Sequence, residues 1–277
     1  ISYFLKLIRF NKPIGFMLLM WPSWFALALL PINQNELFFW YFVFFVGSFL
    51  MRSAGCIIND FVDINIDNKI TRTSDRPLTS KKISLMGALV FLIILLLLSL
   101  LILMQFSSKT MMIGLFSIPL ILLYPFMKRF THWPQLTLGI VFSWGVILVS
   151  YEFQNNFNLD FILLYIGCIF WTLAYDTIYA YQDREDDIKN NIKSTAVLFN
   201  KKGIWFVKIF YLTFFLIIGY LSWKTSNSFY SLTVISIYIF GMNFLLNKWE
   251  TTSKDSSNYF FKFNNIIGLC CFLLLLI

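Results

Sequence analysis

The chain has 277 residues, of which 58% are hydrophobic and only 13% are charged. Soluble domains carry about 25% charged residues, so this composition argues against a soluble protein and predicts one embedded in the lipid bilayer. The net charge of +8 does not indicate a nucleic-acid partner, because the basic residues are scattered between apolar runs and form no continuous basic stripe.

Nine apolar runs follow one another along the chain, and a helix that spans a bilayer needs roughly 20 such residues. They lie near residues 14–31, 37–58, 83–104, 111–127, 134–151, 160–181, 204–223, 229–246 and 262–277. The pattern predicts an all-α membrane protein with one domain over residues 1–277, in which nine transmembrane helices surround a central cavity. Pro22, Pro119 and Pro125 fall inside runs, where membrane helices tolerate them as kinks.

Lysine and arginine are concentrated in the N-terminal segment and in the loops after the even-numbered runs, whereas the opposite loops hold only Lys109 and Lys224. An excess of positive charge marks the cytoplasmic side of a membrane protein. We therefore expect the N-terminus and the even-numbered loops to be cytoplasmic. The loops after the second and sixth runs are also long and acidic, which topology alone does not explain.

The first acidic stretch is "IINDFVDINIDNKITRTSDRPL", residues 57–78. On a helix, Asp60, Asp63 and Asp67 fall within an arc of about 60°, and Asn59 lies close to that arc. Asp75 lies outside it, next to Arg76. The spacing therefore predicts three carboxylates that point in one direction at a cytoplasmic helix end.

The second acidic stretch is "YDTIYAYQDREDD", residues 175–187. Asp176, Tyr179, Asp183 and Asp187 are spaced at i, i+3, i+7 and i+11, so a continuous helix would place them on one stripe. This interpretation adds a second cluster of acids on the same side of the membrane. The alternative is that both clusters are solvated loop acids that balance the nearby bases.

Carboxylates packed closely repel one another unless a cation joins them. Their hard oxygen ligands suit Mg²⁺, which is commonly bound by one or two carboxylates together with phosphate oxygens and water. Two facing clusters could hold a diphosphate between bridging Mg²⁺ ions, and Arg72, Arg76 and Lys193 could neutralise the remaining phosphate charge.

The two stretches resemble the aspartate motifs of the intramembrane aromatic prenyltransferases of the UbiA superfamily. "NDFVDINIDNKITRTSDRPL" is similar to their first motif, NDxxDxxxD followed by RTxxRPL, and "YDTIYAYQDREDDIKNNIKST" is similar to their second. "NKPIGFMLLMWPSWFAL", "MRSAGCIIND" and "YPFMKRFTHWPQ" also resemble the 4-hydroxybenzoate polyprenyltransferases of ubiquinone biosynthesis. The similarity covers about residues 6–200.

The resemblance implies transfer of a polyprenyl group from polyprenyl diphosphate to the ring carbon ortho to the hydroxyl of 4-hydroxybenzoate. It also implies that the catalytic residues hold Mg²⁺, at Asp60, Asp63, Asp67, Asp183 and Asp187. Asn59 would join them as a ligand or an orienting partner. Tyr175 and Tyr179 are candidates to stabilise the allylic cation through their ring faces.

The acceptor carboxylate needs a basic partner, and several residues compete for that role. Arg52 lies inside the second run, where an unpaired charge is costly and usually functional. It could bind the acceptor, or it could form an internal ion pair with Asp60 or Asp176. Lys128 and Arg129 are the other candidates, and His132 is more simply explained as structural.

Two other readings stay open at this stage. A prenyltransferase of the same superfamily with a haem, naphthoate or chlorophyll-type acceptor would share the diphosphate half of the site. A membrane transporter, from a different class, would also use nine spans and intramembrane charge. The expected location is a bacterial inner membrane, or the mitochondrial inner membrane if the source is eukaryotic, with the active site on the cytoplasmic side.

Overall fold

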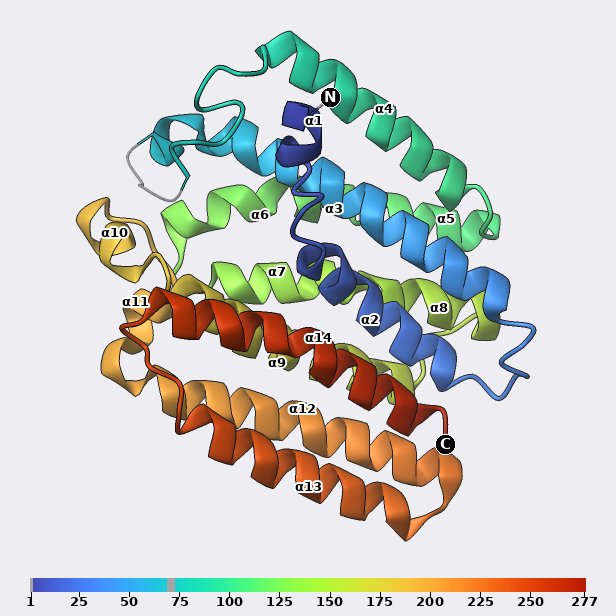
Figure 1. Cartoon of the computed structure of the whole chain (residues 1–277). Helices are drawn as coiled ribbons and strands as arrows, with labels where there is room; N and C mark the ends of the chain where they lie inside the picture. Colours follow the sequence, from blue (N-terminus) through green and yellow to red (C-terminus); the bar gives the residue numbers. More distant parts are fainter. Residues whose placement is uncertain (1, 69–72) are drawn as a thin grey trace.

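The computed structural model describes residues 2–68 and 73–277, and in these ranges it contains helices, turns and loops but no β-strand. The predicted all-α fold is confirmed (Figure 1). In chain order the elements are α1 (Ser2–Leu7), α2 (Ile14–Ala28), α3 (Phe38–Asp67), α4 (Leu85–Leu103), α5 (Ser108–Leu115), α6 (Ile118–Phe130), α7 (Pro134–Phe142), α8 (Trp144–Gln154), α9 (Leu159–Ala180), α10 (Arg184–Lys189), α11 (Thr195–Phe199), the 3₁₀ turn η1 (Asn200–Lys202), α12 (Gly203–Ser226), α13 (Phe229–Leu246) and α14 (Lys254–Leu275).

Eight segments of the described chain are long and apolar enough to cross a membrane. The first predicted run instead yields α2, an apolar helix of 15 residues. At 1.5 Å per residue it extends about 22 Å, which is less than the roughly 30 Å of a bilayer core. The predicted count of nine full spans is therefore not confirmed.

Three of the eight segments consist of more than one helix, and one of them, Thr195–Ser226, comprises α11, η1 and α12. α5 ends at Leu115, which is four residues before Pro119, and a proline ring clashes with the carbonyl at that position. The segment from Pro134 to Gln154 is divided at Ser143 into α7 and α8. Here α8 approaches α2 so closely that a Cβ on Gly145 would lie 1.9 Å from Ser23 Oγ.

The boundaries of two other helices differ from the predicted runs. α3 has 30 residues and continues beyond the predicted end at 58 to Asp67, so the first acidic motif belongs to its last turns. α14 begins at Lys254, earlier than the predicted start at 262. Its first turn is capped by Ser253, whose side chain accepts a hydrogen bond from the Ser256 N–H, and such capping favours helix initiation in polar sequence.

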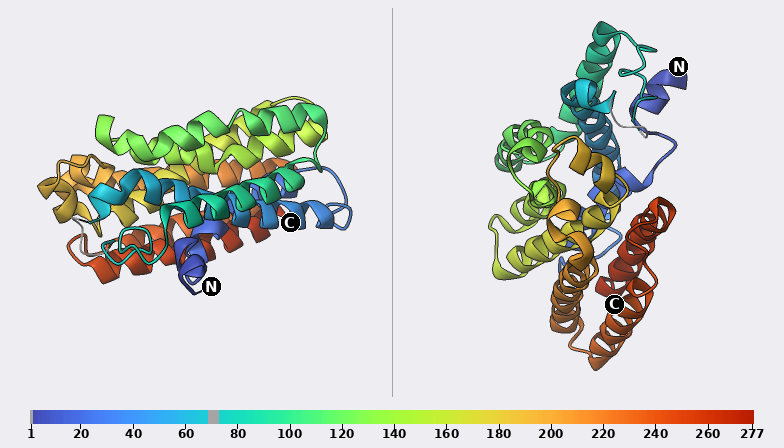
Figure 2. Two further views of the ribbon diagram at one scale, coloured as in Figure 1. Left: turned by 90° about the horizontal axis from the view of Figure 1, so that it is seen from above. Right: turned by 90° about the vertical axis from the view of Figure 1, so that its left-hand side faces the viewer.

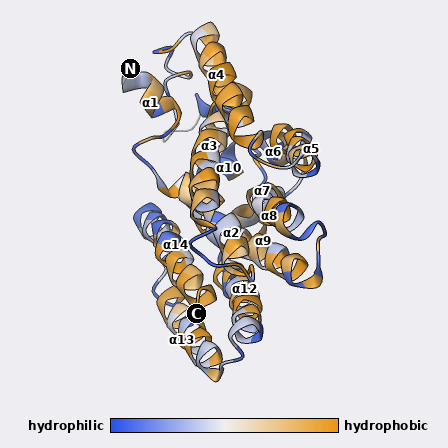
Figure 3. Ribbon diagram, turned by 90° about the vertical axis from the view of Figure 1, so that its right-hand side faces the viewer, coloured by the Kyte–Doolittle hydropathy of each residue, from blue (hydrophilic) through white to orange (hydrophobic). Residues whose placement is uncertain are grey.

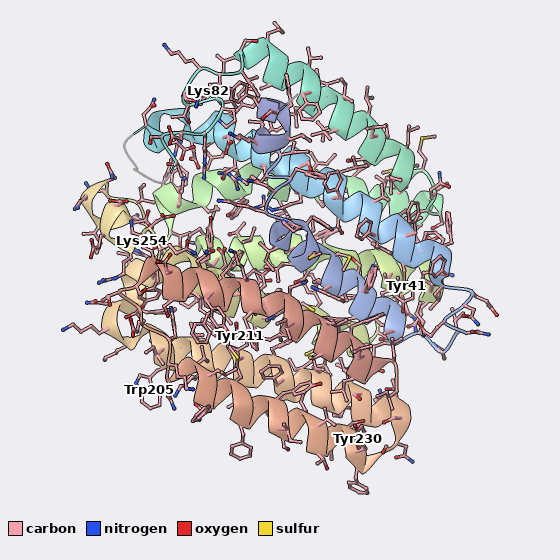
Figure 4. All side chains as sticks on the ribbon, in the orientation of Figure 1. Tyr41, Lys82, Trp205, Tyr211, Tyr230 and Lys254 are labelled. Carbon is pink, nitrogen blue, oxygen red and sulfur yellow. The ribbon has the colours of Figure 1, made fainter. Side chains whose placement is uncertain are left out.

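α9 lies at the centre of the bundle, against α7, α12 and α14 (Figure 1). Its Trp171 stacks on Phe214 of α12 at a centroid distance of 5.1 Å. The Trp171 Nε1–H and the Tyr211 hydroxyl both donate to Asn264 Oδ1 of α14, each at 2.8 Å. Figure 4 labels Tyr211 in this interior region. The buried amide of Asn264 therefore connects three helices.

The outer helices carry their apolar side chains on the surface. Leu97 of α4 and Phe240 of α13 are more than half exposed, and Figure 3 shows hydrophobic residues along most of the helices and polar residues mainly at their ends. An exposed apolar surface of this extent is favourable only in contact with lipid. Multiple apolar helices thus support an integral, multi-pass membrane protein.

The ends of several helices meet at one end of the bundle. The C-terminal ends of α3 and α6, the short helices α10 and α11, and the start of α14 all lie on the left side of Figure 1. The views in Figure 2 show the same grouping from two other directions. This arrangement places the two acidic stretches near each other, although they are distant in the sequence.

Candidate active site

A single large cavity contains most of the residues selected from the sequence. Its volume is about 1920 Å³, and it is lined both by polar residues from the grouped helix ends and by apolar residues from α2 to α8. The lining includes the sequence-selected residues Arg52, Asn59, Asp63, Asp67, Arg76, Lys128, Asp176, Tyr179, Asp183, Asp187 and Lys193. Asp60 and Arg129 are not part of that lining, and Arg72 lies outside the described residues.

The first acidic motif is built on the last turns of α3. Because the helix continues to Asp67, the carboxylates of Asp60, Asp63 and Asp67 come from successive turns of one rigid element. All three residues are at most 3% exposed. Buried carboxylates are costly unless they are paired with cations or bind a metal, so their partners are decisive.

In residues 2–68 and 73–277, three cations pair with these three carboxylates. Arg76 Nη1 donates to Asp60 Oδ1 at 3.0 Å and to Asp67 Oδ2 at 2.6 Å. Arg9 Nη2 donates to Asp60 Oδ1 at 2.9 Å, and Lys128 Nζ pairs with Asp63 Oδ2. Among the described residues, these three cations offset the charges of the three carboxylates.

These ion pairs do not satisfy every carboxylate oxygen of the first motif. Asp63 Oδ1 is buried and has no hydrogen-bond partner among the described residues. Asp67 lies beyond the apolar span that ends at Ile64, and burial raises the pKa of its carboxyl above the ordinary value, an effect partly offset by the charge of Arg76. A further positive charge at this site would favour the ionised carboxylates.

The second acidic motif does not form the continuous helical stripe predicted from its spacing. α9 ends at Ala180, a turn follows, and α10 begins at Arg184. The Tyr181 hydroxyl donates to the carbonyl of Asn200, and a Cβ at Gly203 would overlap that hydroxyl. These tertiary contacts hold Tyr181 in a turn, and aspartate-rich sequence competes poorly with them because aspartate is a weak helix former.

The break in the helix still leaves the second motif facing the cavity. Asp183 and Asp187 line the cavity together with Asp176 and Tyr179 from the end of α9. Ser194 Oγ donates to Asp187 Oδ2 at 3.2 Å. At the outer side of α10, Asp186 lies 3.9 Å from Lys254 Nζ at the start of α14, the residue labelled in Figure 4.

Two residues that sequence reasoning missed lie in the same cavity as the motifs. Arg9 Nη2 donates to Asp60 Oδ1 at 2.9 Å, and both Arg9 and Tyr124 line the cavity that holds acids of the two motifs. In the sequence, Arg9 is one of the bases of the N-terminal segment and indicates only membrane topology. Its backbone is left-handed, with φ of 57°, which is uncommon for a non-glycine residue and turns the chain just before "NKPIG".

Arg52 lies deeper in the cavity and makes no ion pair within 4 Å to any described residue. Its Nη1 donates to Cys56 Sγ at 3.0 Å, and its Nε is buried without a hydrogen-bond partner. Gly15 of α2 approaches it so closely that a Cβ there would lie 2.8 Å from Arg52 Nε. A buried guanidinium with an unused donor is suited to an anionic group that enters the cavity.

The remaining basic candidates have different surroundings. Arg129 Nη2 donates to the carbonyl of Val62 at 2.9 Å, and its guanidinium lies over the Phe126 ring. Lys193 Nζ donates to the carbonyl of Phe130 at 3.1 Å. His132 has a buried Nδ1 without a partner in the described chain. Of the two arginines considered for the acceptor, only Arg52 lines the cavity.

Comparison with known proteins agrees with this geometry. Residues 19–266 match the UbiA prenyltransferase family. The chain belongs to this family. It is 36% identical over 271 residues to the 4-hydroxybenzoate octaprenyltransferase of Psychromonas ingrahamii, covering 97% of this chain and 93% of the relative. It is 38% identical over 272 residues to the enzyme of the same name from Serratia proteamaculans, covering 96% and 92%.

Solved structures show the same fold at low sequence identity. The apo structure of a UbiA homologue from Aeropyrum pernix K1 superposes with a TM-score of 0.73 at 18% identity, over 94% of this chain and 95% of that one. A UbiA homologue from Archaeoglobus fulgidus, bound to GPP and Mg²⁺, gives 0.68 at 15% identity over 99% of both chains. The family resemblance predicted from the two acidic motifs is thus confirmed.

Proposed function

We propose that this UbiA-family protein transfers a polyprenyl group from polyprenyl diphosphate to the ring carbon ortho to the hydroxyl of 4-hydroxybenzoate, a membrane step of ubiquinone biosynthesis. The observation that carries the proposal is one cavity that joins two acidic motifs to a long apolar region. The relatives that match nearly the whole chain bear the name of this activity.

The acidic residues fit a divalent metal. Their oxygen ligands are of the type that Mg²⁺ prefers, and Asp63 Oδ1 is buried without a partner in the described chain. Within the described residues no three acidic, histidine or cysteine side chains converge on one point, and the first-motif carboxylates are directed to Arg9, Arg76 and Lys128 instead. We propose Asp60, Asp63, Asp67, Asp183 and Asp187 as the metal-binding residues.

Bound Mg²⁺ would stabilise the negative charge that develops on the departing diphosphate. Arg9, Arg76 and Lys128 lie beside the same carboxylates and can shift to phosphate oxygens when a diphosphate enters. Lys193 and Arg72 are proposed as further diphosphate partners, and Asn59 as an orienting amide. Arginine suits this role because its planar group binds phosphate through two donors.

The apolar part of the cavity fits the prenyl tail. Its total volume of about 1920 Å³ exceeds the roughly 300–1,000 Å³ of ordinary ligand pockets. When the carbon–oxygen bond of the substrate breaks, its electron pair leaves with the diphosphate and an allylic cation remains. The faces of Tyr175 and Tyr179, which line the cavity, can stabilise that cation.

The aromatic acceptor then attacks with its ring carbon, a carbon–carbon bond forms, and the ring proton is released. We propose that Arg52 binds the acceptor carboxylate, because its Nε has no partner in the described chain. Asp176 lines the same cavity as Arg52, and we propose that its carboxylate balances the charge of the guanidinium. Arg129 is the weaker candidate, since it donates to a backbone carbonyl and does not line the cavity.

We place the site on the cytoplasmic side of a bacterial inner membrane, or of the mitochondrial inner membrane if the source is eukaryotic. The concentration of lysine and arginine in loops at that end supports this orientation. A transporter is the alternative from another class. The described acids that line the cavity come from the ends of α3 and α9, from the turn after α9 and from α10. This arrangement suits a diphosphate bound at one end of the bundle and not a path across the membrane.

The test is an assay in membranes that contain the protein, with labelled polyprenyl diphosphate and 4-hydroxybenzoate. We expect a prenylated hydroxybenzoate, identified by mass spectrometry, only when Mg²⁺ is present. Dihydroxynaphthoate and haem supplied in parallel should give no product. Product from one of these and none from hydroxybenzoate would assign the protein to another branch of the family.

A further inference from the structure

The segment 193–195 lies between the two acidic motifs and contacts the elements that carry both of them. On one side, the Lys193 N–H donates to the carbonyl of Lys128 at 2.9 Å, and Lys128 pairs with Asp63. On the other side, Ser194 donates to Asp187. A short series of contacts therefore connects a carboxylate of the first motif with a carboxylate of the second.

The hydroxyl of Ser194 has a defined orientation. Its oxygen accepts from the Val197 N–H at 3.3 Å, as the N-cap of α11, so its single proton is available for Asp187 Oδ2 at 3.2 Å. Both Ser194 and Asp187 are buried. A hydrogen bond from a hydroxyl to a carboxylate is charge-assisted, and at its usual length of about 2.5–2.7 Å it is stronger than one between neutral groups. The 3.2 Å contact here is longer, and shortening by a few tenths of an ångström would bring it into that range.

The next residue anchors the segment to the protein core. The Thr195 N–H donates to Gln135 Oε1 at 3.1 Å, and the hydroxyls of Thr195 and Thr177 are 2.7 Å apart. Gln135 belongs to the first turn of α7 and is also buried. Thr177 belongs to α9, and both helices pack in the interior of the bundle. They therefore hold the segment, and Ser194 of the segment contacts Asp187.

We propose that Ser194 and Gln135 are positioning residues that orient the Asp187 carboxylate toward the divalent metal. This inference rests on the proposed function, in which Asp187 binds that metal. Mg²⁺ requires near-ideal octahedral geometry, so its ligands must be held in fixed positions. The helix that carries Asp187, α10, has only six residues and exposes Glu185, Ile188 and Lys189. It therefore needs contacts from other segments to fix the carboxylate. Partners behind metal-binding residues typically contribute a factor of about 10–100 in metal affinity.

The experiment measures binding of Mn²⁺, as a spectroscopic probe for Mg²⁺, by electron paramagnetic resonance in the purified full-length protein with inorganic pyrophosphate present. We expect Ser194→Ala to weaken Mn²⁺ binding by roughly 10-fold or more. Ser194→Thr keeps the hydroxyl and should retain near-normal affinity. Gln135→Leu removes the anchor of the segment and should cause a smaller loss, of a few-fold.

Ser222→Ala is the matched control. Ser222 is also a buried serine, and its hydroxyl donates to the carbonyl of Leu274 at 3.0 Å, but it does not line the cavity. The control should lower thermal stability without changing Mn²⁺ affinity. A similar loss of affinity in Ser222→Ala and Ser194→Ala would overturn the positioning role.

A further variant, Asp187→Asn, separates this inference from the proposed function. If Asp187→Asn leaves Mn²⁺ affinity unchanged, the assignment of Asp187 as a metal ligand fails. If it weakens binding but Ser194→Ala and Gln135→Leu do not, only the positioning role is wrong. Should Ser194→Ala fail to fold, Gln135→Leu with unchanged affinity still contradicts the inference.

Discussion

The two acidic motifs reach the same cavity by different structural means. The first lies on a 30-residue helix, and its carboxylates are neutralised by Arg9, Arg76 and Lys128. The second lies on a turn and a six-residue helix, and Asp187 receives a hydrogen bond from Ser194. The carboxylates of the first motif are thus placed by one rigid helix, whereas the position of Asp187 in the second motif depends on neighbouring segments.

The largest effect is expected from removing one carboxylate of each motif. Asp63→Ala and Asp187→Ala should each lower prenyl transfer by at least about 100- to 1,000-fold, because charge on the departing diphosphate would no longer be stabilised. Product formation at saturating Mg²⁺ measures the effect, with membrane insertion checked separately. Asp75→Ala is the control, since Asp75 is exposed and belongs to neither cluster. Near-normal turnover in either test variant would remove that residue from the site.

The second prediction concerns the cations of the first motif. Arg76 pairs with Asp60 and Asp67, so a metal ion must compete with it for the same oxygens. Hydrogen bonds to charged groups contribute about 1.5–3 kcal/mol. We therefore expect Arg76→Gln to bind Mn²⁺ about 10-fold more tightly when no pyrophosphate is present, and to bind pyrophosphate more weakly.

The control for this prediction is Lys82→Gln. Lys82, labelled in Figure 4, carries the same charge in the loop that follows Arg76, but it is exposed. Its Nζ lies 5.9 Å from the centroid of the Tyr3 ring. Its substitution should leave both affinities within about two-fold, as is typical of exposed charges. Weaker Mn²⁺ binding in Arg76→Gln would mean that this arginine supports the metal site instead of competing with it.

The third prediction distinguishes binding of the aromatic acceptor from binding of the prenyl diphosphate. Arg52→Ala should raise the KM for 4-hydroxybenzoate by about 10- to 100-fold, the cost of losing a charge-assisted pair, with little change in the KM for the prenyl substrate. Arg129→Ala should change neither value by more than a few-fold, because its guanidinium contacts Val62 and Phe126. Equal weakening of both substrates in Arg52→Ala would assign Arg52 to the diphosphate.

The two motifs also differ in how far the sequence predicts their structure. Apolar runs and residue spacing were sufficient for the all-α fold and for the three carboxylates of α3, because helix geometry is local. The pairing of Arg9 with Asp60 spans 51 residues, and no local pattern encodes such a contact. The turn after Ala180 likewise depends on tertiary contacts of Tyr181 with Asn200 and Gly203. Hydropathy alone does not give the early start of α14, because its first residues are polar. It also extends α2 too far, because Leu29 and Leu30 are apolar, although a proline at the next position disfavours helix.

The smallest effect on metal binding is expected from a change in the backbone conformation after α10, at Asn191. Asn191 follows α10 in the left-handed conformation, with φ of 54°, and the next N–H, of Ile192, donates to the Asp187 carbonyl at 2.9 Å. This turn directs the chain back toward Ser194.

A left-handed backbone costs an ordinary residue roughly 1–2 kcal/mol, whereas asparagine and glycine accept it more easily. Asn191→Ala should therefore weaken Mn²⁺ binding with pyrophosphate by a few-fold, and Asn191→Gly should not. The side chain is exposed, so a difference between these two variants isolates the backbone. Equal affinities in both would show that the hydrogen bond from Ser194 positions Asp187 without help from the turn.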